Sequence, residues 1–215
     1  MKKDDTERFY DRNEAGLALA QKLEHYKDSE AIVIGVPRGG VPVAFAVAME
    51  LRLPLEIILV KKLGHPNNKE YAIGAVSLND RLLINDENVS ASYIESETRA
   101  LRERLMEMER KFCRSRKPLA LANKTVILVD DGIATGTTLL ATIRLLRKSM
   151  VQRIVLAVPV ASETALKKLA AAVDECVCLL TPDYFTGVGA FYDDFAQTTD
   201  EEVAELLELA QRNAV

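Results

Sequence analysis

The stretch V-I-L-V-D-D-G-I-A-T-G-T-T, residues 126–138, constrains the fold more than any other part of the chain. Residues 125–129 are all β-branched or leucine, which is typical of a strand buried on both faces. Two adjacent carboxylates, Asp130 and Asp131, follow, and then a loop of small residues. Apolar residues then recur at helical spacing, at Leu139, Ile143, Leu146 and Met150. The stretch therefore predicts a strand, an acidic turn, a loop and a helix, in that order.

This order places a site for a phosphate beside a site for hydroxyl groups. The N–H groups of the loop and of the helix N-terminus are unpaired donors at the positive end of a dipole. Thr135, Thr137 and Thr138 add hydroxyl donors, and glycine lets the backbone approach an anion closely. Asp130 and Asp131 would repel that phosphate, so they need hydroxyl donors or a hard cation. A ribose 5-phosphate carries a phosphate for the small-residue loop and hydroxyl groups for the acidic pair.

Other interpretations of the motif fit less well. Asp131-Gly132 suits a hairpin turn, but a second strand would alternate, whereas the spacing after Gly136 is helical. A Walker phosphate loop needs a different spacing and a lysine, and the dinucleotide fingerprint G-x-G-x-x-G is absent.

With these residues the sequence resembles the type I phosphoribosyltransferases, whose signature is a hydrophobic strand, two acidic residues and a T-G-x-T loop. The resemblance implies that Asp130 and Asp131 hold the ribose hydroxyls of phosphoribosyl pyrophosphate. It also implies Mg²⁺ as the cofactor, bound to these two carboxylates directly or through ribose or water. The residues expected to bind the 5-phosphate are Ala134, Thr135, Gly136, Thr137 and Thr138, and Gly132 before them is also expected to bind the substrate.

The same order of elements occurs about a hundred residues earlier. A buried strand over 31–36 leads into P-R-G-G and an apolar helix over 41–51. Gly39 and Gly40 can expose their N–H groups, and the fork of Arg38 matches phosphate oxygens. A tight turn alone would not require Arg38 at its tip. In the family this segment binds pyrophosphate, often with a non-proline cis peptide.

A basic pair follows the next expected strand, Leu55 to Val60. It opens K-K-L-G-H-P-N-N-K-E, which the turn residues predict to be a polar loop. Lys61 and Lys62 stand where the family commonly has basic residues that reach towards pyrophosphate. Because strand side chains alternate, only one can face the site, and we favour Lys61. His65 is interpreted as a loop residue.

Residues 61–120 correspond to the hood or lid of the family. A hairpin is expected over 71–84, and then a helix opened by Ser92 that runs to about Arg114. Its buried face would be Leu101, Leu105, Met108 and Phe112, and its i,i+4 ion pairs Glu95–Arg99, Arg99–Glu103 and Glu107–Lys111. A lid would exclude water during reaction, but a packing or dimerisation helix suits residues 92–114 equally well.

The remaining strands, over 153–160 and 176–180, alternate with a helix over 163–171. Alternation of this kind predicts an α/β fold with a doubly wound, mainly parallel sheet, flanking helices and a small hood, in one domain over 1–215. Both loops would lie at the carboxyl ends of parallel strands, where such sheets bind ligands.

The two ends of the chain carry weaker signals. The opening F-Y-D-R-N-E-A-G resembles a stand-alone subgroup of the family, and Asp11 with Glu14 forms a capping box. We interpret Arg12 as part of a solvated helix start. The tail over 181–215 resembles the P-D-x-F segment of purine-type members, so Phe185 is the candidate to cover a base. We expect Phe191, Tyr192 and Phe195 to pack the end of the sheet, and Thr199 with Glu202 to cap a last helix.

Composition bounds the environment and the partners. A net charge of −4 gives no general attraction to nucleic acid or to an anionic membrane. The start has no apolar segment typical of a signal peptide, and the apolar run Val41 to Met49 is too short to span a bilayer. The three cysteines suggest reduced thiols. We expect a cytoplasmic homodimer that acts on small molecules.

The activity expected is Mg²⁺-dependent transfer of a phosphoribosyl group from phosphoribosyl pyrophosphate to a nitrogenous base, with Arg38 and a lysine offsetting charge on the leaving group. Hypoxanthine–guanine enzymes have an aspartate where this chain has Ala134, and a base-reading lysine where it has Ala161-Ser162. An oxopurine acceptor is therefore disfavoured, and the base is left open. The alternative is a non-catalytic regulator that senses a phosphoribosyl ligand or nucleotide.

Overall fold

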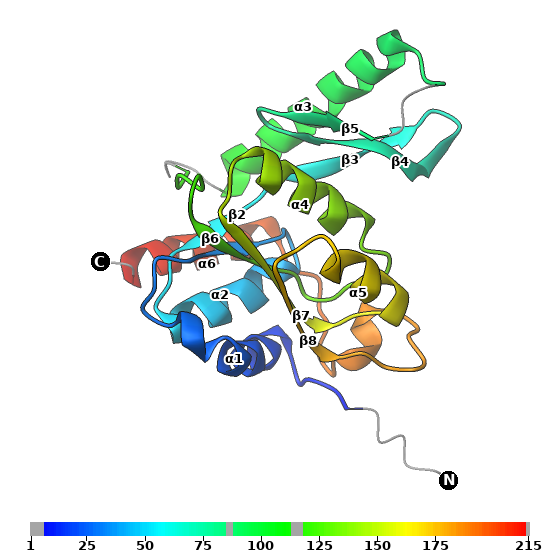
Figure 1. Ribbon diagram of the computed structural model, residues 1–215. Helices are drawn as coiled ribbons and strands as arrows, with labels where there is room; N and C mark the ends of the chain where they lie inside the picture. The colour runs from blue at the N-terminus through cyan, green and yellow to red at the C-terminus, as the bar shows by residue number, and fades with distance from the viewer. Residues whose placement is uncertain (1–6, 85–87, 113–117, 214–215) are drawn as a thin grey trace.

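A central sheet of five parallel strands organises the protein. The computed structural model describes residues 7–84, 88–112 and 118–213, and the strand order is β2-β1-β6-β7-β8 (Figure 1). The strands are β1 (Ile32–Gly35), β2 (Leu55–Ile57), β6 (Thr125–Val129), β7 (Arg153–Val160) and β8 (Glu175–Leu180). The expected doubly wound α/β fold is confirmed.

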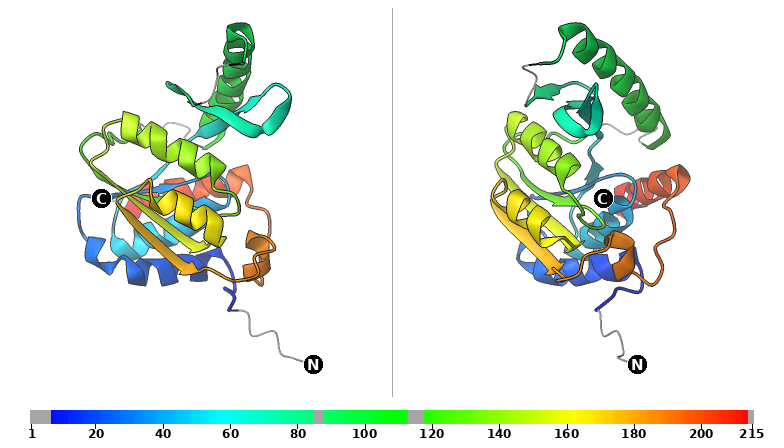
Figure 2. Two further views of the ribbon diagram at one scale, coloured as in Figure 1. Left: turned by 45° about the vertical axis from the view of Figure 1, so that its right-hand side comes forward. Right: turned by 90° about the vertical axis from the view of Figure 1, so that its right-hand side faces the viewer.

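Helices cover both faces of this sheet. Helices α1 (Arg12–Lys22), α2 (Gly40–Leu51) and α6 (Asp200–Asn213) lie on one face, and α4 (Thr137–Lys148) and α5 (Glu163–Ala170) on the other (Figures 1 and 2). The side chains of successive residues of β6 point to opposite faces of the sheet, because side chains alternate along a strand. Ile127 and Val129 pack with the first group of helices, and Val126 and Leu128 with the second. This explains why the whole strand is apolar.

The direction of winding reverses between β1 and β6. Strand β1 lies between β2 and β6, and Gly35 is the register partner of Val129. After β1 the chain enters α2 on one face, whereas after β6 it enters α4 on the other. Two loops therefore diverge from neighbouring strand ends, which is where open α/β sheets bind ligands.

A second, antiparallel sheet stands to one side of the central sheet with a long helix (Figure 2). It contains β3 (Val60–His65), β4 (Asn68–Ser77) and β5 (Arg81–Leu83), and the helix is α3 (Ala91–Phe112). The hairpin expected over 71–84 is confirmed by the β4–β5 pairing. Leu101, Leu105 and Phe112 are buried, as predicted, and Met108 is partly buried.

Several boundaries in this region differ from expectation. The strand expected over Leu55 to Val60 ends at Ile57, and Val60 begins the second sheet. The expected polar loop over 61–70 is wrong, because residues 60–65 and 68–77 pair as strands around a turn at Pro66-Asn67. Turn residues there mark a tight hairpin turn rather than a long loop.

Two helix predictions also need correction. Helix α3 is capped by Ser90, whose Oγ accepts from Tyr93 N at 3.3 Å, and not by Ser92. None of its three expected ion pairs occurs within the described ranges; Lys111 instead donates to Asp200 at 2.8 Å. Met150 lies beyond the end of α4 and is 71% exposed, so it is not part of the buried face. Arg114 lies outside the described residues.

Two capping predictions are confirmed. Asp11 accepts from Glu14 N at 2.8 Å at the start of α1, and Thr199 accepts from Glu202 N at 3.0 Å at the start of α6. The expected capping box at α1 differs in its second bond, because the Glu14 carboxylate accepts from Tyr10 N and not from Asp11 N. Short 3₁₀ helices occur at Glu24–Tyr26 and Val188–Phe191. Cys176 and Cys178 are free thiols, and Cys113 lies outside the described residues. Within the described ranges, no helix combines the length and the apolarity that crossing a membrane requires.

Candidate functional site

The two glycine loops meet at the carboxyl ends of β1 and β6. A Cβ placed on Gly39 would lie 2.0 Å from Asp131 Oδ2, and one on Gly40 would lie 2.8 Å from the Cα of Asp130. Only glycine permits such an approach without displacing the neighbouring loop. The peptide between Pro37 and Arg38 is cis. The loop that carries Arg38 and the acidic pair therefore form one site.

The acidic pair is partly buried, and this shapes its electrostatics. Asp130 Oδ1 accepts a hydrogen bond from Asp131 N at 2.9 Å. Burial, and then the charge of Asp131, raise the pKa of Asp130 well above its ordinary value. Burial also raises the pKa of Asp131, although the charge of Arg12 opposes that shift. Two adjacent carboxylates in this setting favour a ligand that brings hydroxyl donors or a cation.

Arg12 belongs to the site, and the prediction that it is a solvated helix residue is wrong. Its Nε lies 2.9 Å from Asp131 Oδ2, and the exposed fractions of the two side chains are 12% and 15%. Its guanidinium stacks 3.9 Å from the ring centroid of Phe195, and Nη1 donates to the carbonyl of Ala196 at 2.8 Å. The available sequence signal was the position of Arg12 within F-Y-D-R-N-E-A-G.

The C-terminal tail packs directly on the acidic turn. A Cβ on Gly132 would lie 2.5 Å from Val188 Cγ1. The hydroxyl of Tyr192 donates to the carbonyl oxygen of Asp131 at 2.7 Å. Phe191 and Tyr192 are buried, as predicted, but Phe195 is 36% exposed and carries the Arg12 guanidinium instead of filling the core.

The loop before α4 has the form of an anion site. Gly136 has φ 67°, a left-handed conformation that glycine adopts readily, and it caps α4 without a described side-chain hydrogen bond. Thr135 and Thr138 are exposed, and the carbonyl of Ala134 accepts from Ser162 Oγ at 2.7 Å. The hydrogen bond from Ser162 to this carbonyl holds the loop in place, and the N–H groups at the N-terminus of α4 can still bind an anion.

The predicted basic residues take up different positions. Arg38 Nη1 lies 3.6 Å from Asp200 Oδ1, at the start of α6. Lys62 pairs across the second sheet with Ala75, which packs against α4. Lys61 therefore lies on the opposite face, the face that carries Leu63. The expected alternation is present, and the role of either lysine remains a prediction.

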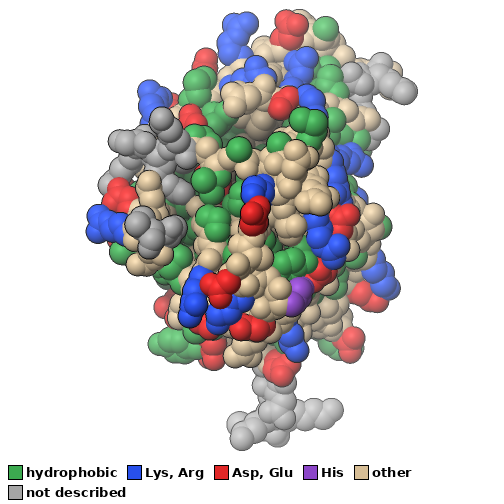
Figure 3. Space-filling view, turned by 60° about the vertical axis from the view of Figure 1, so that its left-hand side comes forward, with side chains coloured by type: hydrophobic (Ala, Val, Ile, Leu, Met, Phe, Trp, Pro, Cys, Tyr) green, Lys and Arg blue, Asp and Glu red, His purple; other side chains and the backbone are tan. Residues whose placement is uncertain are grey.

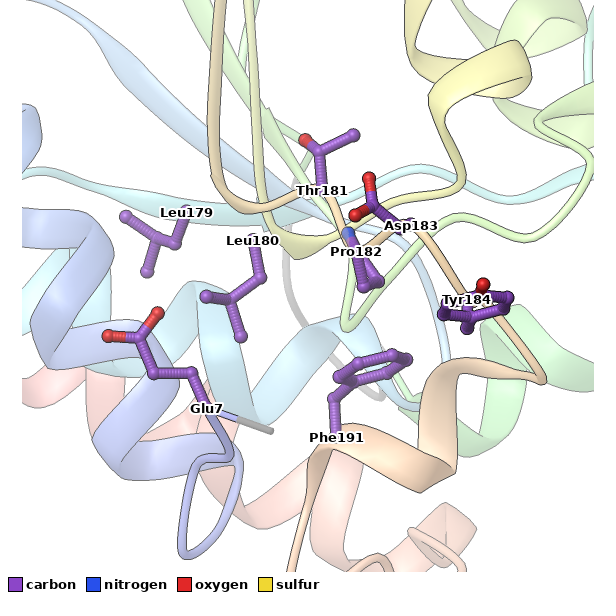
Figure 4. Close-up of a pocket in the computed structure, with 8 residues that line it drawn as sticks. All are labelled: Glu7, Leu179, Leu180, Thr181, Pro182, Asp183, Tyr184 and Phe191. Atoms are coloured by element: carbon purple, nitrogen blue, oxygen red, sulfur yellow. The ribbon is translucent and has the colours of Figure 1, made fainter. Parts of the chain in front are cut away.

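A cavity of about 690 Å³ opens beyond the carboxyl end of β8 (Figure 4). Its lining residues are Glu7, Leu179, Leu180, Thr181, Pro182, Asp183, Tyr184 and Phe191. Phe185, the candidate to cover a base, stacks on Phe191 with 5.8 Å between ring centroids and is partly buried. The tail therefore places aromatic rings beside this cavity, and other residues of the tail, Val188 and Tyr192, contact the acidic turn.

The carboxylates of Asp130 and Asp131 suit a divalent cation whose coordination is completed by oxygen atoms of a bound ligand. Among the described residues no group of three or more His, Cys, Asp or Glu side chains could hold a metal ion. Mg²⁺ commonly binds through one or two carboxylates together with phosphate oxygens of a substrate. The donor set fits such a shared site and not a cage built by the protein alone.

Comparisons with known proteins agree with this geometry. The family model described as phosphoribosyl transferase domain matches residues 6–196. Two Mycobacterium tuberculosis proteins, from strains CDC 1551 / Oshkosh and ATCC 25618 / H37Rv, are both named putative phosphoribosyl transferase. Each is 40% identical over 210 residues, which are 95% of this chain and 47% of theirs. The chain thus spans about half the length of these curated relatives.

Solved structures show the same fold. The crystal structure of TT1426 from Thermus thermophilus has a TM-score of 0.87 and 39% identity, and the match covers 93% of this chain and 97% of that one. A hypothetical protein from Neisseria gonorrhoeae with bound ppGpp has a TM-score of 0.50 at 14% identity, with 96% of each chain covered. The second likeness concerns the fold alone.

Proposed function

The chain belongs to the phosphoribosyl transferase family, and from this premise we propose that it transfers a phosphoribosyl group from phosphoribosyl pyrophosphate to a nitrogenous base. The observation that carries the proposal is the contact of Gly39 and Gly40 with the acidic pair. One donor molecule can then reach both glycine loops while its ribose lies at the two carboxylates.

Each part of the site has a distinct task in this proposal. The loop 134–138 and the α4 N-terminus bind the 5-phosphate, and Asp130 and Asp131 accept from the ribose hydroxyls. Gly39 offers its N–H group to the pyrophosphate, and Arg38 turns from Asp200 to bind its oxygens. The N–H group of Gly40, which was also expected to be exposed, instead donates to the carbonyl of Val36 at 3.1 Å and holds the loop in shape. Mg²⁺, when bound, supplies positive charge to the pyrophosphate oxygens.

The reaction breaks one bond and forms another at the anomeric carbon. The bond from C1 to the pyrophosphate oxygen breaks, the electron pair leaves with pyrophosphate, and a nitrogen of the base bonds to C1. The proton of that nitrogen passes to solvent. Positive charge develops on the sugar, and Asp130 and Asp131 stabilise it from nearby. Fixed geometry supplies much of the remaining acceleration.

The tail provides the place for the acceptor. Phe185 stacks on Phe191, in the same tail whose Val188 contacts Gly132 of the acidic turn, and we propose that a flat base stacks on Phe185. Ala134 and Ser162 offer neither a carboxylate nor an ammonium group to an oxopurine. The acceptor is therefore a base that the site reads mainly through stacking and backbone groups.

Release of pyrophosphate tests the proposal. The purified chain is incubated with Mg²⁺, phosphoribosyl pyrophosphate and each member of a panel of purines, pyrimidines and related bases, beside the variant Asp131→Asn. We expect release with at least one base, and a rate at least about a hundredfold lower in the variant. Binding of the donor without release on any base would instead support the non-catalytic regulator.

A further inference from the structure

We propose that Arg12 is a positioning residue that holds the carboxylate of Asp131 in the orientation required to accept a ribose hydroxyl. The inference rests on the proposed function, because it assigns a ribose to the acidic pair. It adds to that site a residue from the first turn of α1, which lies 119 positions from Asp131 in the sequence.

Three contacts fix the guanidinium. Nε donates to Asp131 Oδ2 at 2.9 Å, Nη1 donates to the carbonyl of Ala196 at 2.8 Å, and the plane stacks on Phe195 at 3.9 Å. A side chain anchored at three points has little freedom to follow the carboxylate, so the carboxylate is held by the arginine. The exposed fraction of the Arg12 side chain is 12%, which limits screening by solvent.

The tail that carries Phe195 and Ala196 is hydrogen-bonded to the N-terminal segment. Phe9 N donates to the Phe191 carbonyl and Asp193 N donates to the Phe9 carbonyl, both at 2.9 Å. Asp194 N donates to the Tyr10 carbonyl at 2.8 Å. The start of α1 and the tail therefore form one unit around Arg12. This unit contacts the Asp131 carboxylate through the arginine, and the rest of the acidic turn through Val188 and Tyr192.

The arrangement leaves Asp131 able to bind a ligand. A carboxylate has two acceptor oxygens, and Arg12 occupies Oδ2. The oxygen Oδ1 stays available to a hydroxyl of the ribose. Gly39 lies against the same carboxylate and Tyr192 holds the Asp131 carbonyl, so the position of the residue is set from three directions.

Binding of two simple ligands separates positioning from general disruption. Ribose 5-phosphate needs the acidic pair, whereas inorganic pyrophosphate without Mg²⁺ needs only the loop with Arg38. Calorimetric titration with each ligand, in EDTA so that no cation links pyrophosphate to the carboxylates, is applied to the wild-type chain, Arg12→Gln, Arg12→Lys and Phe195→Leu. The matched control is Lys22→Gln, which removes an exposed charge from the other end of α1.

We expect Arg12→Gln to bind ribose 5-phosphate about tenfold more weakly or worse, and to bind pyrophosphate within about twofold of the wild type. Arg12→Lys should recover part of the loss, because an ammonium keeps the charge without the fork. Phe195→Leu keeps the arginine and removes its platform, so an intermediate loss confined to ribose 5-phosphate is expected. Lys22→Gln should match the wild type with both ligands.

Other outcomes overturn the inference. Equal losses for both ligands in Arg12→Gln and Phe195→Leu would show a structural role. Unchanged or tighter binding of ribose 5-phosphate in Arg12→Gln would show that Arg12 is dispensable or competes with the ribose. A wild-type chain that binds neither ligand would refute the proposed function itself and this inference with it, a result distinct from the other two.

Discussion

Asp130 and Asp131 lie side by side in a partly buried turn, where two like charges are unfavourable. Desolvation and mutual repulsion raise the pKa of Asp130, and Arg12 moderates the cost at Asp131. Functional sites often retain such unfavourable groups because the ligand relieves them. The pair therefore makes opposite contributions to stability and to function.

Replacing Asp130 by asparagine tests this opposition. A carboxyl group whose pKa is raised on folding binds its proton more tightly in the folded state, so the native protein loses stability as pH rises through that pKa. Asp130→Asn should therefore raise the free energy of unfolding at pH 8, by roughly 1 kcal/mol, and less at pH 5. It should also abolish transfer.

Denaturant unfolding at the two pH values measures the change. The control is Asp183→Asn, which alters an exposed carboxylate in the tail. Equal or lower stability of Asp130→Asn at pH 8 would contradict the account of the pair.

Gly39 and Gly40 are adjacent, yet a methyl group at each should act differently. At Gly39 the methyl would meet the Asp131 carboxylate, a side-chain end that can turn away only by giving up its hydrogen bond with Arg12. At Gly40 it would meet the Asp130 Cα and the Val129 carbonyl, which belong to the backbone. We expect Gly39→Ala to reduce activity strongly and to cost less stability than Gly40→Ala, which should destabilise the protein by about 1–3 kcal/mol.

Thermal unfolding and steady-state rates on the same preparations distinguish the two. The reverse pattern, with Gly39→Ala the less stable variant and Gly40→Ala fully active, would show that the loops are not in contact as described.

At the scale of elements, the acidic turn is enclosed by segments that are distant in sequence. The 3₁₀ helix Val188–Phe191 covers Gly132, and α1 reaches the turn through Arg12. The start of α6 reaches the other loop, because Asp200 lies near both Arg38 and Lys111 of α3. The helices therefore control access to residues that the strands position.

A double-mutant cycle tests the docking of the tail. Gly132→Ala places a methyl against Val188 and, less closely, Val160, so it should destabilise the protein. Val188→Ala should do so by leaving a cavity. In the double variant the added methyl occupies part of that space. We therefore expect the double variant to be about 1 kcal/mol more stable than the sum of the two single losses predicts. Strict additivity in denaturant unfolding would mean that the two residues do not touch.

Asp200 should restrain Arg38 in the absence of ligand. Removing its charge with Asp200→Asn frees the guanidinium, so pyrophosphate should bind about threefold more tightly. The effect is small because the pair is partly exposed. Titration calorimetry measures it, with Glu201→Gln as the control, since that carboxylate lies in the same helical turn. Weaker binding by Asp200→Asn would show that Asp200 does not restrain Arg38 in the absence of ligand.

For the whole molecule, local sequence patterns were sufficient to predict the central sheet and the two glycine loops. Strand apolarity, helical periodicity and glycine position are encoded within a few residues of one another, so the sequence was enough to locate Asp130, Gly39 and Gly136 in the loops between a strand and a helix, while their roles stay predictions. Arg12 could not, because its partners are 119 and 184 positions away and only the folded chain brings them together.

The second sheet was predicted less well for a related reason. Residues 61–70 contain enough turn formers to suggest a loop, but pairing between β3 and β4 overrides local propensity.

The surface carries charges of both signs: on the face shown in Figure 3, acidic and basic side chains are intermingled. With a net charge of −4, the account predicts that a small anion binds through the local geometry of the site.

A crystal structure of the chain with phosphoribosyl pyrophosphate and Mg²⁺ would locate each part of the donor. We expect the 5-phosphate on residues 134–138, the ribose hydroxyls on Asp130 and Asp131, and the pyrophosphate on the loop of Gly39 and Gly40. Density for the ligand elsewhere, such as in the cavity beside β8 with both glycine loops empty, would contradict this expectation.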